Sequence, residues 1–332
     1  MKIIWVLVLV TTALNWPTSK TNPCLEKNKV YETLNLKKNA TVCFNTIDSY
    51  DLDYKGKDAL TIYGKITFPP IKKKKYDAVI LSHGSGGIRK YHNNYIKLLN
   101  NNGYVVFQID HYLSRKIKYD KTFSKVSGIT FMNDAYKALE LLKTHPEINK
   151  IAYIGWSQGG VGPILSHFSF VSDFINNGKH IFDASIAIYP YCGFTFPKDS
   201  ITQTPLLILT GKDDDLTPEA ACINLFDKFS KNKKIKHISL ENARHGYDNP
   251  FLYFGMTFDN LPSLHIISND CTLTISESGK IMTLSGKLIH GPKESSAILD
   301  ECSTKGVKVK YNSKAREDTN EYILDFLKEN LK

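Results

Sequence analysis

The chain has 332 residues, of which 42% are hydrophobic and 23% are charged, and this composition is typical of a globular protein. The formal net charge of +10 comes mainly from lysine, and the lysine run at residues 72–75 lacks the arginines and interleaved aromatic residues of a nucleic-acid-binding patch. These features exclude nucleic acid from the expected partners, and we interpret the run as a solvated loop before a strand.

The first residues have the pattern of a secretion signal. Lys2 precedes an apolar run that ends at Leu14 and is shorter than the roughly 18–20 residues needed to span a bilayer. We expect a signal peptide over residues 1–20, cleaved after Ala13 or Ser19, and a secreted or periplasmic protein. An uncleaved anchor is the alternative. No later segment is long and apolar enough to predict a stable membrane span after cleavage.

The chain has six cysteines, and none of them forms a Cys-x-x-Cys pair, so neither a zinc site nor thioredoxin-type chemistry is expected. An even number of cysteines in an exported chain predicts disulfides, with buried free thiols as the alternative. Six cysteines allow about 15 pairings. Their order along the chain suggests the pairs Cys24–Cys43, Cys192–Cys222 and Cys271–Cys302.

Predicted strands and helices alternate along most of the chain. Residues 21–46 are polar and rich in lysine and asparagine, which predicts an N-terminal extension, and residues 47–68 predict two antiparallel strands. Further strands are expected at residues 78–81, 105–109, 152–154, 184–188, 206–209 and 235–240, and helices at residues 95–101, 130–144, 218–230 and 318–331. Apolar strands separated by helices predict an α/β fold, a mostly parallel sheet covered on both faces.

Residues 250–310 interrupt this alternation. They contain strand-like stretches at residues 264–267 and 272–284, and Ser-Glu-Ser-Gly at residues 276–279 predicts a hairpin turn. We therefore expect a β-rich insertion before the last helix, so that the main domain consists of residues 47–249 and 311–332.

The most informative motif is Gly-Trp-Ser-Gln-Gly at residues 155–159, which follows an apolar strand and precedes a helical pattern. This is the context of a G-x-S-x-G nucleophile elbow, in which both flanking positions require glycine because a Cβ atom would collide. The motif predicts Ser157 as a nucleophile, and a glycine-rich turn with a capping serine is the alternative. Pro163 is expected to kink the following helix.

A serine nucleophile needs a histidine base that is oriented by a carboxylate, and in this type of sheet the chain order is serine, acid, histidine. Three aspartates follow the strand at residues 206–209, and we favour Asp214 as the acid, with Asp213 and Asp215 capping the turn or the helix. His245 follows the strand at residues 235–240 in a loop beside a glycine, and it is the expected base.

The glycine-rich loop at residues 82–87 follows an early strand and is expected to help bind an oxyanion. We expect the backbone N–H of Gln158 and that of Ser85 or Gly86 to be the donors, and His83 to brace the loop. The glycine spacing differs from both phosphate-binding motifs. No metal and no organic cofactor are expected.

Together these residues resemble the α/β-hydrolase superfamily and, more narrowly, the dienelactone hydrolase family, over about residues 55–250 and the C-terminal helix. The similar segments are the loops at residues 83–87, 211–218 and 243–248, Asp110 followed by Arg115, residues 133–135, and residues 306–311. The resemblance implies the α/β-hydrolase fold and again selects Asp214. The eponymous enzymes use a cysteine nucleophile where this chain has Ser157, and the insertion is longer than the family's short link, so their specificity is not expected to transfer.

We therefore expect an exported serine hydrolase that cleaves a small-molecule carboxylic ester or related acyl compound through an acyl-enzyme on Ser157. Arg115 and Arg244 are candidates for holding an acidic substrate, and each is equally expected to be a surface or structural ion-pair residue. A non-catalytic exported binding protein on the same scaffold and a peptidase are the alternatives. The sequence carries no signal for an oligomeric state.

Overall fold

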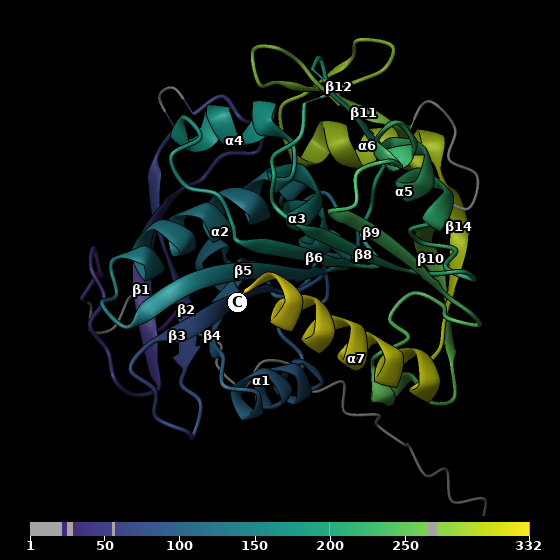
Figure 1. Cartoon of the computed structure of the whole chain (residues 1–332). Coiled ribbons are helices and arrows are strands. Elements are labelled where there is room, and N and C mark those ends of the chain that lie inside the picture. The colour runs from purple at the N-terminus through teal and green to yellow at the C-terminus, as the bar shows by residue number, and fades with distance from the viewer. Residues whose placement is uncertain (1–21, 25–28, 55–56, 199, 264–270, 332) are drawn as a thin grey trace, which may run out of the picture.

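The computed structural model describes residues 22–24, 29–54, 57–198, 200–263 and 271–331 (Figure 1). The signal peptide expected at residues 1–20 and the strand-like stretch at residues 264–267 lie outside the described residues. Within the described part of the chain, no helix combines the length and the hydrophobicity that a bilayer-spanning segment needs.

A central sheet of eight strands organises the fold. Its strands are β1 (Ala40–Ile47), β2 (Ala59–Thr67), β3 (Tyr76–Ser82), β4 (Val105–Asp110), β5 (Ile148–Trp156), β6 (Ala184–Ile188), β8 (Leu206–Gly211) and β9 (Ile235–Leu240). Their order is β1-β2-β4-β3-β5-β6-β8-β9, with β2 antiparallel to both of its neighbours and the pairs from β4 to β9 all parallel. The predicted mostly parallel sheet is therefore confirmed.

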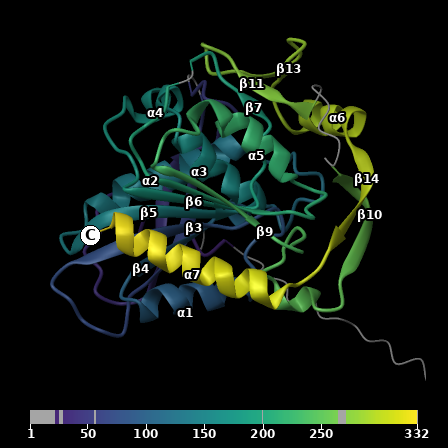
Figure 2. The same ribbon diagram turned by 45° about the vertical axis from the view of Figure 1, so that its right-hand side comes forward.

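Helices cover both faces of this sheet. Figures 1 and 2 show α1 (His92–Asn101) and α7 (Ser313–Asn330) on one face, and α2 (Gly128–Lys143), α3 (Val161–Ser166) and α5 (Glu219–Phe226) on the other. A further short helix, α4 (Ser169–Asn176), follows α3.

The alternation of side chains along the central strands gives each face its own core. In β5, Ile151 and Tyr153 pack in the core beneath α2 and α3, whereas Ala152 and Ile154 pack in the core above α1 and α7. Both faces of the strand are buried, which is why its sequence is continuously apolar rather than alternating.

The first strand begins earlier than predicted. β1 starts at Ala40, so the N-terminal extension expected at residues 21–46 was too long. Val42 and Phe44 enter the main core, while Cys43 between them points to the opposite face and bonds to Cys24. Alternate residues of β1 therefore face the core, but the many lysines and asparagines of this region make that alternation difficult to recognise in the sequence.

Pro163 does not interrupt a long helix. It is the third residue of α3, within the first turn, where the backbone N–H groups have no partner inside the helix and a proline is tolerated. The last helix, α7, begins at Ser313, earlier than predicted, because the side chain of Asn312 accepts a hydrogen bond from the N–H of Ala315 and caps it.

The expected insertion is β-rich, but it also contains a helix that was not predicted. A ribbon pairs β10 (Met256–Ser263) with β14 (Thr304–Val309), and a small sheet has the order β13-β12-β11-β7. Its strands are β7 (Phe194–Thr195), β11 (Leu273–Ile275), β12 (Ile281–Thr283) and β13 (Leu288–Ile289). The unpredicted helix is α6 (Pro292–Cys302). The hairpin expected at residues 276–279 joins β11 to β12.

The small sheet and α6 of the insertion lie on the same side of the central sheet as α2 and α3, whereas β10 and β14 run along the edge of the molecule (Figures 1 and 2). The small sheet is anchored to the main domain, because β7 from the segment after β6 pairs in parallel with β11. Three disulfides join Cys24 to Cys43, Cys192 to Cys222 and Cys271 to Cys302, the same pairs that the sequence order suggested. The last of them ties the start of β11 to the end of α6.

Candidate active site

Three parallel strands bring the predicted site residues to one edge of the sheet. β5 ends directly before Ser157, β8 ends three residues before Asp214, and β9 ends five residues before His245. Carboxyl ends of parallel strands share an edge, so loops that are distant in sequence become neighbours there. All three side chains are buried.

The turn after β5 holds Ser157 in the left-handed region of backbone space, with φ of 53°. Such a conformation is costly for a residue other than glycine and persists only where the surroundings impose it. A Cβ atom at Gly155 would lie 2.1 Å from the carbonyl oxygen of Gly159, and one at Gly159 would lie 2.3 Å from the carbonyl oxygen of His83. Both flanking glycines are therefore required by close backbone contacts.

His245 contacts the other two residues through its two ring nitrogens. Its Nε2 lies 2.8 Å from the Oγ of Ser157, and its Nδ1 lies 2.8 Å from the Oδ2 of Asp214. With Nδ1 protonated and donating to the carboxylate, Nε2 is free to accept the hydroxyl proton of Ser157. This is the geometry of a base that activates a serine.

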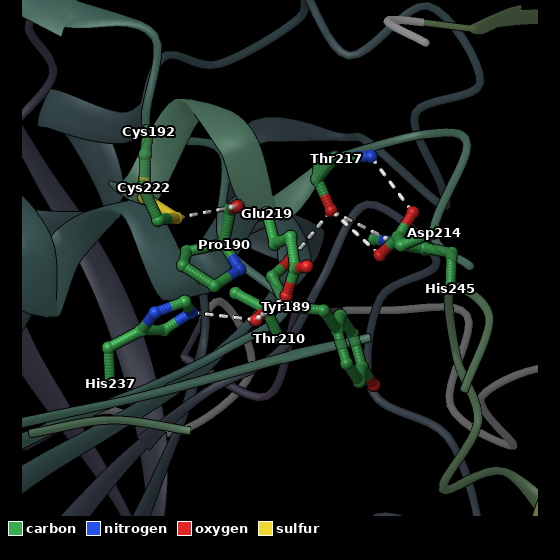
Figure 3. Close-up of a disulfide and its surroundings, with 10 residues drawn as sticks. All are labelled: Tyr189, Pro190, Cys192, Thr210, Asp214, Thr217, Glu219, Cys222, His237 and His245. Carbon is green, nitrogen blue, oxygen red and sulfur yellow. Dashed lines mark hydrogen bonds and ion pairs between the residues drawn. A yellow bond between two sulfur atoms is a disulfide. The ribbon is translucent and has the colours of Figure 1, made fainter. Parts of the chain in front are cut away.

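The loop after β8 holds the Asp214 carboxylate from several sides. Its Oδ1 accepts hydrogen bonds of 2.9 Å from the backbone N–H groups of Leu216 and Thr217. The hydroxyl of Thr217 lies 3.0 Å from Oδ2 of Asp214, 3.1 Å from Nδ1 of His245 and 3.1 Å from the carbonyl oxygen of Tyr189 (Figure 3). Thr217 was not predicted as a site residue, because a threonine after an aspartate turn has no distinguishing signal in the sequence.

A buried carboxylate lies behind His245. The ring of Tyr189 packs edge-on against the imidazole with 4.7 Å between centroids, and its hydroxyl donates to Oδ1 of Asp248. Oδ2 of Asp248 accepts from the hydroxyl of Tyr95 and from Nε1 of Trp156. Burial raises the pKa of Asp248, and the hydrogen bonds from these three donors offset part of that rise. These hydrogen bonds hold the ring of Tyr189 in place, and the imidazole of His245 packs against that ring.

The chain returning from the insertion braces the histidine loop. The backbone N–H of Asn312 donates to the carbonyl oxygen of Tyr247, and its side-chain amide donates to that of Asn242. His245 itself forms an isolated parallel bridge with Val309 at the end of β14. The position of His245 therefore depends on the segment between the insertion and α7.

The loop after β3 reaches the serine at Gly84. A Cβ atom there would lie 3.1 Å from the Cβ of Ser157 and 3.2 Å from the carbonyl oxygen of Trp156, so glycine permits a close approach. The neighbouring Ser85 is held by its carbonyl oxygen, which accepts a hydrogen bond from the N–H of Asp120. Ser85 and Gly86, whose backbone N–H groups are predicted oxyanion donors, thus directly follow Gly84, the residue at which this loop approaches Ser157.

Two side chains hold the surroundings of the serine in place. The side chain of Gln158 donates to the carbonyl oxygens of Val126 and Phe123, at 2.8 Å and 3.3 Å. His83 donates from Nδ1 to the carbonyl oxygen of Gly84, and its Nε2 accepts from the N–H of His111. Burial lowers the pKa of His83 to about 4, so the ring is neutral near pH 7 and acts as a brace.

Both arginines named as candidate substrate contacts are bonded to acidic residues of the protein itself. The guanidinium of Arg115 is buried and bonds to Asp134, Asp48 and the carbonyl oxygen of His111. The guanidinium of Arg244 pairs with Asp215 at 2.9 Å. Each arginine is thus engaged in an ion pair within the protein, the alternative that the sequence left open, and a role of either in binding a substrate stays a prediction. The sequence gives the charges but not their partners.

A cavity opens in front of Ser157. Its volume is about 120 Å³, and it is partly open to solvent. Its walls come from the main domain on one side, including Ser157 and Gln158, and from the insertion on the other, including β11, β12 and α6. The residues that the structure describes contain no cluster of three or more histidine, cysteine or acidic side chains that could hold a metal ion.

The sequence matches the model of the dienelactone hydrolase family over residues 65–251, more than half of the chain. No curated protein matches it. A solved dienelactone hydrolase-like promiscuous phosphotriesterase from metagenomic libraries is 14% identical with a TM-score of 0.50, over 88% of this chain and 99% of that one. This likeness shows the α/β-hydrolase fold.

Two further solved structures are similar at lower scores. Est1E from Butyrivibrio proteoclasticus is 17% identical with a TM-score of 0.43, over 60% of this chain and 91% of that one. An acylaminoacyl peptidase from Pyrococcus horikoshii is 16% identical with a TM-score of 0.44, over 64% of this chain and 39% of that one.

Proposed function

The chain belongs to the dienelactone hydrolase family, whose members are hydrolases, and we propose that it is an exported serine hydrolase that cleaves carboxylic esters or related acyl compounds. One observation carries the proposal. Asp214, His245 and Ser157 are joined in that order by two contacts of 2.8 Å, and Ser157 lines a cavity.

In the first half of the reaction, Oγ of Ser157 forms a bond to the carbonyl carbon, and its proton passes to Nε2 of His245. Asp214 keeps the imidazole oriented and stabilises the positive charge that it gains. The bond between the carbonyl carbon and the alcohol oxygen then breaks, Nε2 returns the proton to that oxygen, and the alcohol leaves an acyl-enzyme.

In the second half, a water molecule gives a proton to Nε2 of His245 and adds to the acyl carbon. The bond to Oγ breaks, the proton returns to Ser157, and the acid is released. In both halves the carbonyl oxygen becomes an oxyanion, which accepts hydrogen bonds from the N–H of Gln158 and from that of Ser85 or Gly86. One such donor contributes roughly 3–4 kcal/mol of transition-state stabilisation. The steps need no metal and no organic cofactor.

The alternatives are less well supported. A binding protein would have no use for an imidazole held between a carboxylate and a strained serine. A peptidase would need access for an extended polypeptide, whereas the cavity has walls from both the main domain and the insertion. Export is supported by the three disulfides, which are typical of oxidising compartments, and the proposed location is the periplasm or the extracellular space.

An ester panel with peptide substrates alongside tests the proposal. We expect ester turnover in the wild type, a loss of at least about 1000-fold in Ser157→Ala, and no loss in the control Ser278→Ala, which changes an exposed serine of the β11–β12 hairpin. Full turnover by Ser157→Ala removes Ser157 from the mechanism. Turnover of peptides but not esters identifies a peptidase, and turnover of neither favours a binding protein.

A further inference from the structure

The cavity in front of Ser157 is lined mostly by apolar side chains. We propose that it binds the acyl part of the ester as an uncharged hydrocarbon chain, and that the insertion supplies this specificity. The inference rests on the proposed function and goes beyond it, because it names the substrate class.

The described cavity walls carry no charged side chain. None of the residues that line the cavity is Asp, Glu, Lys or Arg, although the chain as a whole has 43 lysines and arginines. The two tyrosines in the walls are neutral as well: burial raises the pKa of Tyr50 to about 12 and raises that of Tyr191 above its ordinary value. A carboxylate in the acyl group would therefore be desolvated without a partner, which is costly.

The polar groups in the walls are already bonded to the protein. The hydroxyl of Tyr191 donates to the carbonyl oxygen of Cys271, and that of Ser127 donates to the carbonyl oxygen of Tyr50. The Gln158 side chain is held by backbone carbonyl oxygens. Because these side chains already donate their hydrogen bonds to the protein, a polar acyl group would find few donors in the walls. Burial of apolar surface must therefore provide the binding energy.

Apolar side chains line both sides of the cavity. Val161 and Leu165 of α3 come from the main domain. Opposite them stand the buried Ile275, Ile281 and Ile298 of β11, β12 and α6. The disulfide between Cys271 and Cys302 is itself part of the wall and joins β11 to α6. The insertion thus completes an apolar chamber that the main domain alone leaves open on one side.

The acyl group is the part of the ester that this chamber suits best. It remains in the site as the acyl-enzyme on Ser157 after the first half of the reaction, whereas the alcohol leaves at that point. Each methylene of the acyl chain that moves from water into the apolar chamber should raise kcat/KM about fourfold, until the chamber is full.

A series of p-nitrophenyl esters tests the inference on the full-length mature protein. The series consists of acetate, butyrate, hexanoate and octanoate, each used below its aggregation limit, together with the hemisuccinate as an acidic chain of butyrate length. We expect kcat/KM to rise about fourfold per methylene from acetate upward, and to be at least tenfold lower for the hemisuccinate than for butyrate. A flat series, or a preference for the hemisuccinate, overturns the inference.

A pair of matched variants tests the part played by the insertion. Leu299 of α6 lines the chamber and is only partly buried, so Leu299→Trp has room to be accommodated while it fills space. We expect it to lower the ratio of octanoate to acetate kcat/KM at least tenfold. The control Leu288→Trp changes an exposed residue of β13 and should leave the ratio as it is. Equal ratios in the two variants contradict the inference.

The two proposals fail in different ways. If the wild type hydrolyses acetate, Ser157→Ala does not, and chain length has no effect, the chamber inference is wrong and the proposed function stands. If no ester is hydrolysed at all, the proposed function itself is wrong. The chain-length series uses the wild type, so its result does not depend on whether a tryptophan variant folds.

Discussion

The Nε2 of His245 lies 2.8 Å from the Oγ of Ser157, although 88 residues separate the two along the chain. The strands that carry them, β5 and β9, are not neighbours, because β6 and β8 lie between them in the sheet. The contact therefore depends on the loop after β9, whose residues 241–244 carry the chain from the end of that strand to His245. The contacts of that loop with Val309 and Asn312 hold His245 in this position.

The first prediction concerns the hydroxyl of Thr217, which lies within 3.1 Å of both Asp214 and His245. Thr217→Val keeps the shape of the side chain but removes the hydroxyl. A hydrogen bond to a charged group contributes about 1.5–3 kcal/mol, so we expect kcat to fall about 10- to 100-fold. KM should change little, because Thr217 positions the acid and the base. Steady-state kinetics measure both.

The control for this prediction is Thr61→Val, which removes an exposed threonine hydroxyl that donates to Asn45 on the neighbouring strand. It should leave kcat as it is. If Thr217→Val instead raises KM with kcat unchanged, Thr217 contributes to substrate binding rather than to positioning.

The second prediction concerns the turn around the serine. Gly159→Ala places a Cβ atom 2.3 Å from the carbonyl oxygen of His83 and 2.8 Å from that of Ser82, and neither backbone atom can give way cheaply. We expect a loss of about 3 kcal/mol or more in the free energy of unfolding, measured by urea denaturation. Gly291→Ala has an extended backbone and no atom nearer than 3.8 Å, so it should cost little. Equal losses would contradict the packing argument.

The third prediction separates a structural arginine from a surface one. Burial alone would raise the pKa of Asp134, but Arg115 and His111 hold it below its ordinary value. Arg115→Met leaves that buried carboxylate without its main partner, and we expect a loss of about 3–5 kcal/mol in the free energy of unfolding. Arg244→Met breaks a partly exposed pair with Asp215 and should cost about 0–1 kcal/mol.

The same two variants test whether either arginine holds an acidic substrate. Neither should change the ratio of kcat/KM between acidic and neutral esters, because neither guanidinium lies at the cavity. A selective loss of hemisuccinate turnover in Arg115→Met would show that this arginine contacts substrate after all.

The fourth prediction is a pH effect on stability. Burial lowers the pKa of His167 to about 4, and neither ring nitrogen has a hydrogen-bond partner among the described residues. In the unfolded chain His167 binds a proton near pH 6.5, whereas in the folded protein it binds one only near pH 4. Protonation therefore favours the unfolded chain, and the free energy of unfolding decreases as the pH falls from about 6.5 to about 4. The slope from one such group reaches about 1.4 kcal/mol per pH unit.

His167→Phe should remove that part of the slope. The difference between the variant and the wild type at pH 8 reports packing alone, since the ring is neutral there in both the folded and the unfolded chain. Urea denaturation at pH 8, 6 and 4.5 measures the dependence. Parallel curves for the two proteins would show that His167 does not titrate on unfolding.

Much of the site could be predicted because its signals are local. The Gly-x-Ser-x-Gly pattern around Ser157 lies within five residues, although the Cβ atom that Gly159 avoids would meet the distant Ser82 and His83, and the order of Ser157, Asp214 and His245 follows from the strands that precede them. The parallel sheet was visible for a similar reason: strands such as β5 are buried on both faces and are therefore continuously apolar.

The parts that were missed depend on contacts between distant segments. The charge of Arg115 suggests a substrate contact until Asp48 and Asp134 are brought beside it. Helix α6 follows strand-like stretches in a region that was expected to be β-rich, and Ile298 is its single fully buried residue. The apolar chamber depends on the insertion folding back over α3, which no local pattern encodes.

The central claim is that His245 activates Ser157 as a nucleophile. Labelling with a fluorophosphonate, followed by mass spectrometry of the digested protein, tests it most directly, because the probe reacts with an activated serine hydroxyl and remains attached. We predict one adduct, on Ser157, and labelling of His245→Ala that is at least about 1000-fold slower. An unlabelled wild type, an adduct on another residue, or equally fast labelling of His245→Ala would contradict the account.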